Sequence, residues 1–85
     1  MSIPQATFLN FLSGLGTQGL MQVGAIPHPI TGERTANPDF ARYTVELLGV
    51  LKDKSEGRRT PEEEQYLIAM IADLERRLAE ITTAG

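Results

Sequence analysis

The chain has 85 residues, of which 8 are Lys or Arg and 11 are Asp or Glu, so its formal net charge is −3. This length allows one small domain and excludes most large, multistep enzymes. The sequence has no cysteine and one histidine, which excludes disulfides, thiolate catalysis and sulfur or histidine metal clusters. Because so short a chain gains little more from burial than it loses in conformational entropy, we expect self-association or a protein partner.

The N-terminal third of the chain is uncharged, since Glu33 is the first Asp, Glu, Lys or Arg. Residues 8–26 approach the length of a membrane-spanning helix. They contain several Asn, Ser, Thr and Gln residues and four glycines, with no flanking Lys or Arg, and no basic segment precedes them as in a signal peptide. We therefore predict a helix buried in a soluble, cytoplasmic protein; a membrane location is disfavoured.

A first helix is predicted over residues 3–23. Ser2 can cap it with Gln5 at the capping-box spacing, and Gly24 ends it. The repeat of Phe, Leu and Val at helical spacing gives this segment one broad apolar face. The segment should therefore contribute to the core along its whole length.

Glycines are the unusual feature of this segment. Gly14, Gly16 and Gly19 each weaken a helix by roughly 0.5 to 1 kcal/mol relative to Ala. Ser13, Gly16 and Gly19 share one face, next to Leu20, and such a strip of small residues allows another helix to approach closely. The sequence leaves open whether that helix belongs to the same chain or to a second subunit, and whether the glycines only bend a core helix.

The connector over residues 25–36 should be ordered, because Pro27 and Pro29 restrict its backbone and a Thr-Gly pair favours a turn. Ile26 and Ile30 are spaced to reach the same apolar surface. We therefore expect the connector to be pinned across the helices.

A second helix is predicted over residues 38–55, with Asn37 as cap, Pro38 at its first position and Gly57 as its stop. Its apolar positions cover so much of the circumference that the helix should be central. They are Phe40, Ala41, Tyr43, Thr44, Val45, Leu47, Leu48, Val50 and Leu51.

A third helix is predicted over residues 61–81, because Thr60 and Glu63 form a capping box. Its apolar seam follows steps of four and three residues, close to the coiled-coil period. The seam consists of Leu67, Ile71, Leu74, Leu78 and Ile81. Ile68 falls outside the seam, and a subunit interface would account for it.

Two stretches of the sequence resemble a known family. Residues 11–21 (Phe-Leu-Ser-Gly-Leu-Gly-Thr-Gln-Gly-Leu-Met) lead into 26–32 (Ile-Pro-His-Pro-Ile-Thr-Gly), and 47–51 (Leu-Leu-Gly-Val-Leu) precede 60–64 (Thr-Pro-Glu-Glu-Glu). Over about residues 8–81 the chain is similar to the small bacterial family called domain of unknown function 1844. The resemblance implies a short helical bacterial protein without an established activity, so it assigns no functional residues. That family has Asn where this chain has His28, which weakens a catalytic role for this histidine.

No catalytic, cofactor or metal site is predicted. His28 is the one good base at neutral pH, but it has no evident nucleophile beside it, so packing or solvation of the connector is favoured over a role as base or ligand. The acidic residues Asp53, Glu56 and 62–64 lack calcium-loop spacing. The three glycines of the first helix fit a loose dinucleotide-binding pattern, but no strand precedes them.

One basic cluster lies near the end of the second helix. It consists of Lys52, Lys54, Arg58 and Arg59. Two acidic residues within it reduce its charge to +2, and no aromatic residues are interleaved with it. Its position favours interaction with the helix dipole over nucleic-acid binding, although a weak contact with a phosphate or a partner stays open.

These observations predict an all-α fold, with residues 1–85 forming a single three-helix domain that assembles as a homo-oligomer. The function they favour is a non-enzymatic interaction or assembly protein of unknown process that associates through its glycine-bearing first helix. The alternative is a small accessory subunit of a larger protein complex, in one version at a membrane. No specific nucleic-acid partner and no cofactor are expected.

Overall fold

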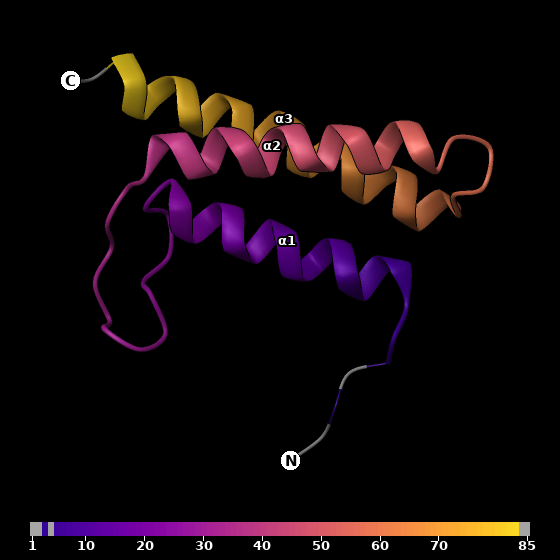
Figure 1. The fold of residues 1–85 in the computed structure, drawn as a ribbon, viewed down its shortest axis with the longest axis horizontal. Coiled ribbons are helices and arrows are strands. Elements are labelled where there is room, and N and C mark those ends of the chain that lie inside the picture. Colours follow the sequence, from indigo (N-terminus) through magenta and orange to yellow (C-terminus); the bar gives the residue numbers. More distant parts are fainter. Residues whose placement is uncertain (1–2, 4, 84–85) are drawn as a thin grey trace.

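The computed structural model describes residues 3 and 5–83, and these form three helices and no β-strand. Helix α1 spans Phe8–Gln22, α2 spans Pro38–Lys54 and α3 spans Pro61–Thr83. Each helix packs against the other two, with α1 along one side of the α2–α3 pair and the α1–α2 connector forming a loop at one end (Figure 1). The all-α three-helix fold predicted from the sequence is confirmed.

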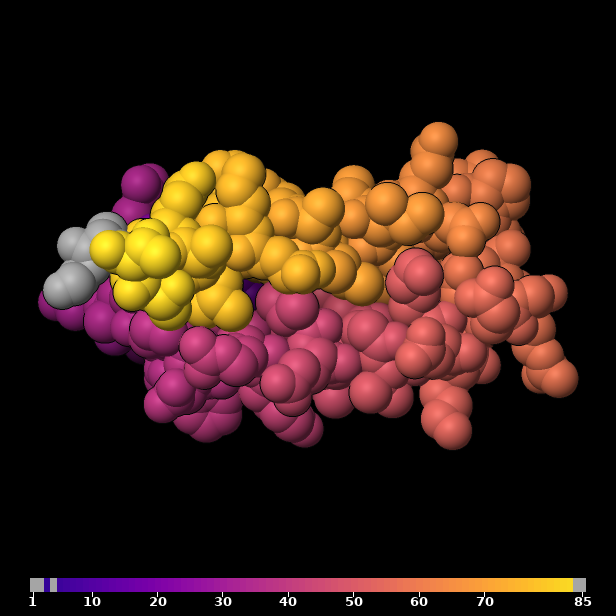
Figure 2. Space-filling view, turned by 90° about the horizontal axis from the view of Figure 1, so that it is seen from above, coloured from indigo at the N-terminus to yellow at the C-terminus, as the bar shows by residue number. Residues whose placement is uncertain are grey.

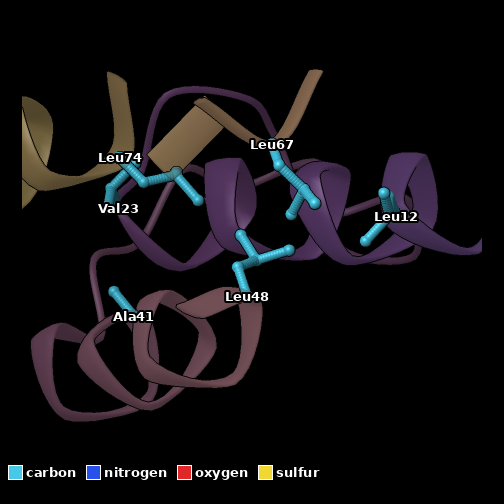
Figure 3. Close-up of a cluster of buried hydrophobic side chains, with 6 residues drawn as sticks. All are labelled: Leu12, Val23, Ala41, Leu48, Leu67 and Leu74. Atoms are coloured by element: carbon cyan, nitrogen blue, oxygen red, sulfur yellow. The ribbon is translucent and has the colours of Figure 1, made fainter. Parts of the chain in front are cut away.

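The core is a cluster of six small and medium apolar side chains between the helices, each at most 5% exposed. They are Leu12, Val23, Ala41, Leu48, Leu67 and Leu74 (Figure 3). Thr44 is the buried polar residue of the described chain. Its hydroxyl donates to Oε1 of Gln22 at 2.5 Å, so the polar group that α2 brings to the core has a partner on α1.

The first helix begins later than predicted. Thr7 caps α1: its backbone is extended and its hydroxyl accepts a hydrogen bond from the Asn10 amide at 3.1 Å. The Asn10 side chain then donates to the Gln5 carbonyl at 2.9 Å. These local bonds compete with helical bonds for the same backbone groups, so the predicted start at residue 3 was wrong. The proposed cap Ser2 lies outside the described residues.

The other helix ends follow their capping residues. Thr60 and Glu63 form the predicted capping box, with reciprocal bonds of 2.8 and 3.2 Å. Asn37 caps α2 as predicted. Helix α3 continues two residues past its predicted end to Thr83, whose hydroxyl donates to the Ala79 carbonyl at 2.7 Å.

The connector is ordered by bonds within itself. The His28 amide donates to the Glu33 carbonyl and the Gly32 amide donates to the His28 carbonyl, both at 2.8 Å, and Gly32 has the positive φ of 72° that the turn requires. Because the loop closes on itself, its tip does not reach the helices. The prediction that Ile30 packs across them was wrong: Ile30 is 87% exposed, whereas Ile26 is half-buried.

Candidate functional site

The glycine strip of α1 is buried against the other helices of the same chain. A Cβ atom on Gly19 would lie 2.7 Å from Cδ1 of Leu74 and 3.3 Å from Cγ2 of Thr44, and one on Gly16 would meet the hydroxyl of Tyr66. Both glycines therefore permit a close approach that no other residue allows without movement of a neighbour. Of the two arrangements left open by the sequence, the structure places this contact within the chain.

The remaining members of the predicted packing face lie at its edges. Ser13 is exposed and sits beside Tyr66, and Leu20 is half-buried against the core. Burial raises the pKa of Tyr66, and a hydrogen bond with the Ser13 side chain partly opposes that rise. Ile68 belongs to a different surface, on the side of α3 away from α1.

Helix α2 is more exposed to solvent than expected of the central helix predicted from its apolar residues. It contacts both other helices, but Phe40, Tyr43 and Val50 are each more than half exposed. With half-buried Leu47 they form a stripe at steps of three, four and three residues, which we call the α2 stripe. Two apolar stripes one residue apart run along this helix: one enters the core and this one faces outwards. The prediction of a central helix treated the two stripes as one face, although each has its own spacing in the sequence.

A shallow groove of about 700 Å³ runs between α2 and α3. It lies on the face opposite α1, where the two helices run side by side (Figure 2). Its floor is apolar or small, and its rim has three carboxylates and one amine. The lining comprises Gly49, Val50, Ile68, Ile71 and Ala72, with Glu46, Lys52, Asp53 and Glu75. We call this the α2–α3 groove. From the sequence, Ile68 was predicted to lie at a second contact; the other residues of the groove were not predicted.

In the structure, Arg59 differs from the other three residues of the basic cluster. The Arg59 side chain is 5% exposed and donates to the Lys52 carbonyl at 2.5 Å, the Ser55 hydroxyl at 3.2 Å, and the carboxylates of Glu56 and Glu64 at 3.1 and 2.8 Å. Hydrogen bonding to Glu64 is the main reason that the pKa of Arg59 is raised, and it lowers the pKa of Glu64 in turn. Arg59 thus closes the C-terminal end of α2 onto α3.

The other three basic residues of the cluster, Lys52, Lys54 and Arg58, lie around this junction without forming one basic surface. Lys52 is half-buried at the groove rim, and Lys54 and Arg58 are exposed. Lys52 and Lys54 are in the last turn of α2, where cations interact favourably with the helix dipole.

His28 has a local structural role. Its Nδ1 accepts a hydrogen bond from the Ile30 amide at 3.1 Å, which places the proton of the neutral ring on Nε2. It lies at a hollow of about 360 Å³, lined also by Gln18, Met21, Gln22, Thr35, Ala36 and Asn37. Thr35 is the one residue with a hydroxyl group among those that line this hollow.

In residues 3 and 5–83, no group of three or more His, Asp or Glu side chains is arranged to hold a metal ion. None of the three helices is both long and apolar enough to cross a membrane, as judged over the same part of the chain.

Comparison with known proteins identifies a family. The model of the family described as domain of unknown function (DUF1844) matches residues 5–80. No curated protein and no solved structure matches the chain. The matched residues include α1, α2 and α3 as far as residue 80. They therefore include the glycine strip, the α2 stripe and the α2–α3 groove. The chain therefore belongs to the DUF1844 family.

Proposed function

We propose that this protein is a non-enzymatic helical interaction protein that self-associates through the α2 stripe. The observation that carries the proposal is the outward row of large apolar side chains on α2, with Phe40, Tyr43 and Val50 exposed by 58%, 57% and 53%. Single exposed apolar residues are ordinary on protein surfaces, but a row at heptad spacing along one helix is typical of a helix–helix interface. The glycine face supports this role indirectly, because it fixes α1 within the protomer.

The shape of the molecule supports association. Its accessible surface is 5967 Å², whereas a compact monomer of this mass exposes about 5,000 Å². Its radius of gyration is 13.5 Å, against about 12 Å for a compact chain of this length. The projecting connector contributes to this excess (Figure 1), and the exposed side chains of the α2 stripe add to it.

An antiparallel pairing of two copies of α2 brings the whole stripe together. When Phe40 of one copy faces Val50 of the other, Tyr43 faces Leu47. All four positions of the stripe then meet in one apolar seam.

Sedimentation equilibrium over a wide concentration range tests this proposal. The wild type should form a dimer of twice 9.3 kDa, and Tyr43→Glu should give a monomer that stays folded, because this side chain is already 57% exposed. Ile30→Glu changes an exposed apolar residue of the connector; it is the control and should leave the dimer intact. A wild-type protein that is monomeric at all concentrations would overturn the proposal.

A further inference from the structure

We infer that the α2–α3 groove binds a basic amphipathic helix of another protein. The groove is built for a helix: four α2 positions at i, i+3, i+4 and i+7 face four α3 positions with the same spacing. At a rise of 1.5 Å per residue these positions run for roughly 10 Å, which corresponds to about two helical turns of a ligand. Amphipathic helices are commonly recognised in apolar grooves of this kind.

The floor of the groove allows close approach. A Cβ atom on Gly49 would meet no atom within 4 Å, so this glycine serves no packing contact within its own chain, unlike Gly16 and Gly19. It lies beside Val50 and Ile68, which are 53% and 54% exposed. The result is a hollow with apolar walls, in which a ligand side chain of leucine size would lose its contact with water.

The rim of the groove determines the chemistry of the ligand. Glu46, Asp53 and Glu75 are exposed, and within residues 3 and 5–83 none of them has a Lys or Arg nitrogen within 4.0 Å. With Lys52 the rim carries a net charge of −2 around an apolar floor. Lysines or arginines flanking the apolar face of a ligand helix would complement these carboxylates, whereas an acidic helix would be repelled.

A second copy of this chain is a poor occupant by the same argument. Two such grooves facing each other would bring their acidic rims together. The arginines of α3 near the groove are already paired within their own helix: Arg76 contacts Asp73 at 2.7 Å and Glu80 at 2.8 Å, and Arg77 contacts Asp73 at 3.0 Å. The proposed dimer uses a different set of residues, the α2 stripe, which overlaps the groove at Val50.

A pair of labelled synthetic helices serves as the probe. Each has about 16 residues, which is long enough to form a helix, with leucines at i, i+3, i+4 and i+7 and either lysines or glutamates elsewhere. Fluorescence anisotropy with the full chain should show binding of the Leu/Lys helix that weakens as salt is raised, and no binding of the Leu/Glu helix. Equal binding of both helices, or binding of neither, would overturn the inference.

Two substitutions locate the binding site. Gly49→Leu fills the groove without straining the fold and should raise the dissociation constant at least about tenfold. Gly14→Leu is its control, since a Cβ at Gly14 also meets nothing within 4 Å but lies on α1. Circular dichroism should show both variants folded. Unchanged affinity in Gly49→Leu would show that the helix binds elsewhere and would refute the inference.

The charge contribution is tested in the same assay. The double variant Glu46→Gln, Glu75→Gln preserves side-chain volume and should weaken binding of the Leu/Lys helix and flatten its salt dependence. Glu33→Gln removes one exposed carboxylate from the connector and should change neither. A salt dependence that is the same in the rim variant and in the connector variant would mean that general charge attraction, and not the rim, binds the helix.

Discussion

Replacement of Gly19 by Ala tests the packing of α1 most directly. In an isolated helix this change is stabilising, because Ala loses less conformational entropy than Gly on folding. In the folded protein the new methyl group would lie 2.7 and 3.2 Å from the two Cδ atoms of Leu74 and 3.3 Å from Cγ2 of Thr44. Both neighbours are buried, at 1% and 2% exposure, so neither has space into which to move.

The sign of the effect follows from two opposing contributions. The gain in helix propensity is about 0.5 to 1 kcal/mol, and overpacking of a filled core costs about 1 to 3 kcal/mol. We therefore expect Gly19→Ala to destabilise the protein by roughly 0.5 to 2 kcal/mol. For a domain of this size each kcal/mol lowers the melting temperature by about 4 to 8 °C.

Two other glycines of α1 provide matched controls. Gly14→Ala should stabilise the protein by about 0.5 to 1 kcal/mol, since its Cβ meets no neighbour. Gly16→Ala should be close to neutral, because the group in its way is the terminal hydroxyl of half-buried Tyr66, which can swing towards solvent. Urea unfolding followed by circular dichroism at 222 nm gives the three values at one protein concentration.

A double-mutant cycle identifies the contact responsible. Leu74→Ala should cost about 2 to 5 kcal/mol by itself, but it removes the two atoms closest to the new methyl group. In that background Gly19→Ala should become neutral or stabilising, which corresponds to a favourable coupling between the two substitutions. If Gly19→Ala is as stabilising as Gly14→Ala in the wild-type background, the close packing of α1 on α3 described above is wrong.

Three further outcomes are expected. Hydrogen bonding to Arg59 lowers the pKa of Glu64 below its ordinary value of 4.5. Their pairing therefore stabilises the fold above that ordinary value and is lost as the pH falls through the lowered folded-state pKa. The melting temperatures of wild type and Glu64→Gln should converge over this fall in pH, and parallel curves would contradict this. His28→Asn should keep the Ile30 amide protected from hydrogen exchange, because an Asn oxygen can accept the same hydrogen bond. His28→Ala should leave this amide unprotected. Equal protection in both variants would show that the side chain at position 28 does not bind the Ile30 amide. Oligonucleotides should not bind with submicromolar affinity at about 150 mM salt, and tight binding that Arg58→Ala abolishes would reverse that expectation.

The sequence predicted a helix end correctly where the capping residue makes its hydrogen bonds with near neighbours in the chain. Thr60 with Glu63, and Asn37 before Pro38, each satisfy backbone groups by contacts within three residues, so the sequence contains the whole interaction. At the N-terminus several residue types compete for the same role. Ser2 and Thr7 both fit a cap, and the bonds of Asn10 that favour Thr7 depend on the path of the preceding backbone.

The remaining differences depend on tertiary geometry. Spacing showed that α2 is apolar around much of its surface, but which of its two stripes enters the core is decided by where α1 and α3 pack. The loop closure that leaves Ile30 exposed requires a backbone bond between His28 and Glu33, five residues apart. Arg59 follows a glycine-containing turn, and only the folded turn directs its side chain back to the Lys52 carbonyl.

The Arg59 contacts also bear on the order in which the chain folds. They join neighbours in sequence, since every acceptor lies within seven residues of Arg59, so the α2–α3 hairpin forms at a small cost in loop closure. Helix α1 has three glycines in its interior and is joined through a long connector, so it gains stability chiefly by docking onto a hairpin that already exists. Native-state opening should then begin with undocking of α1, while α2 and α3 remain paired as one cooperative unit.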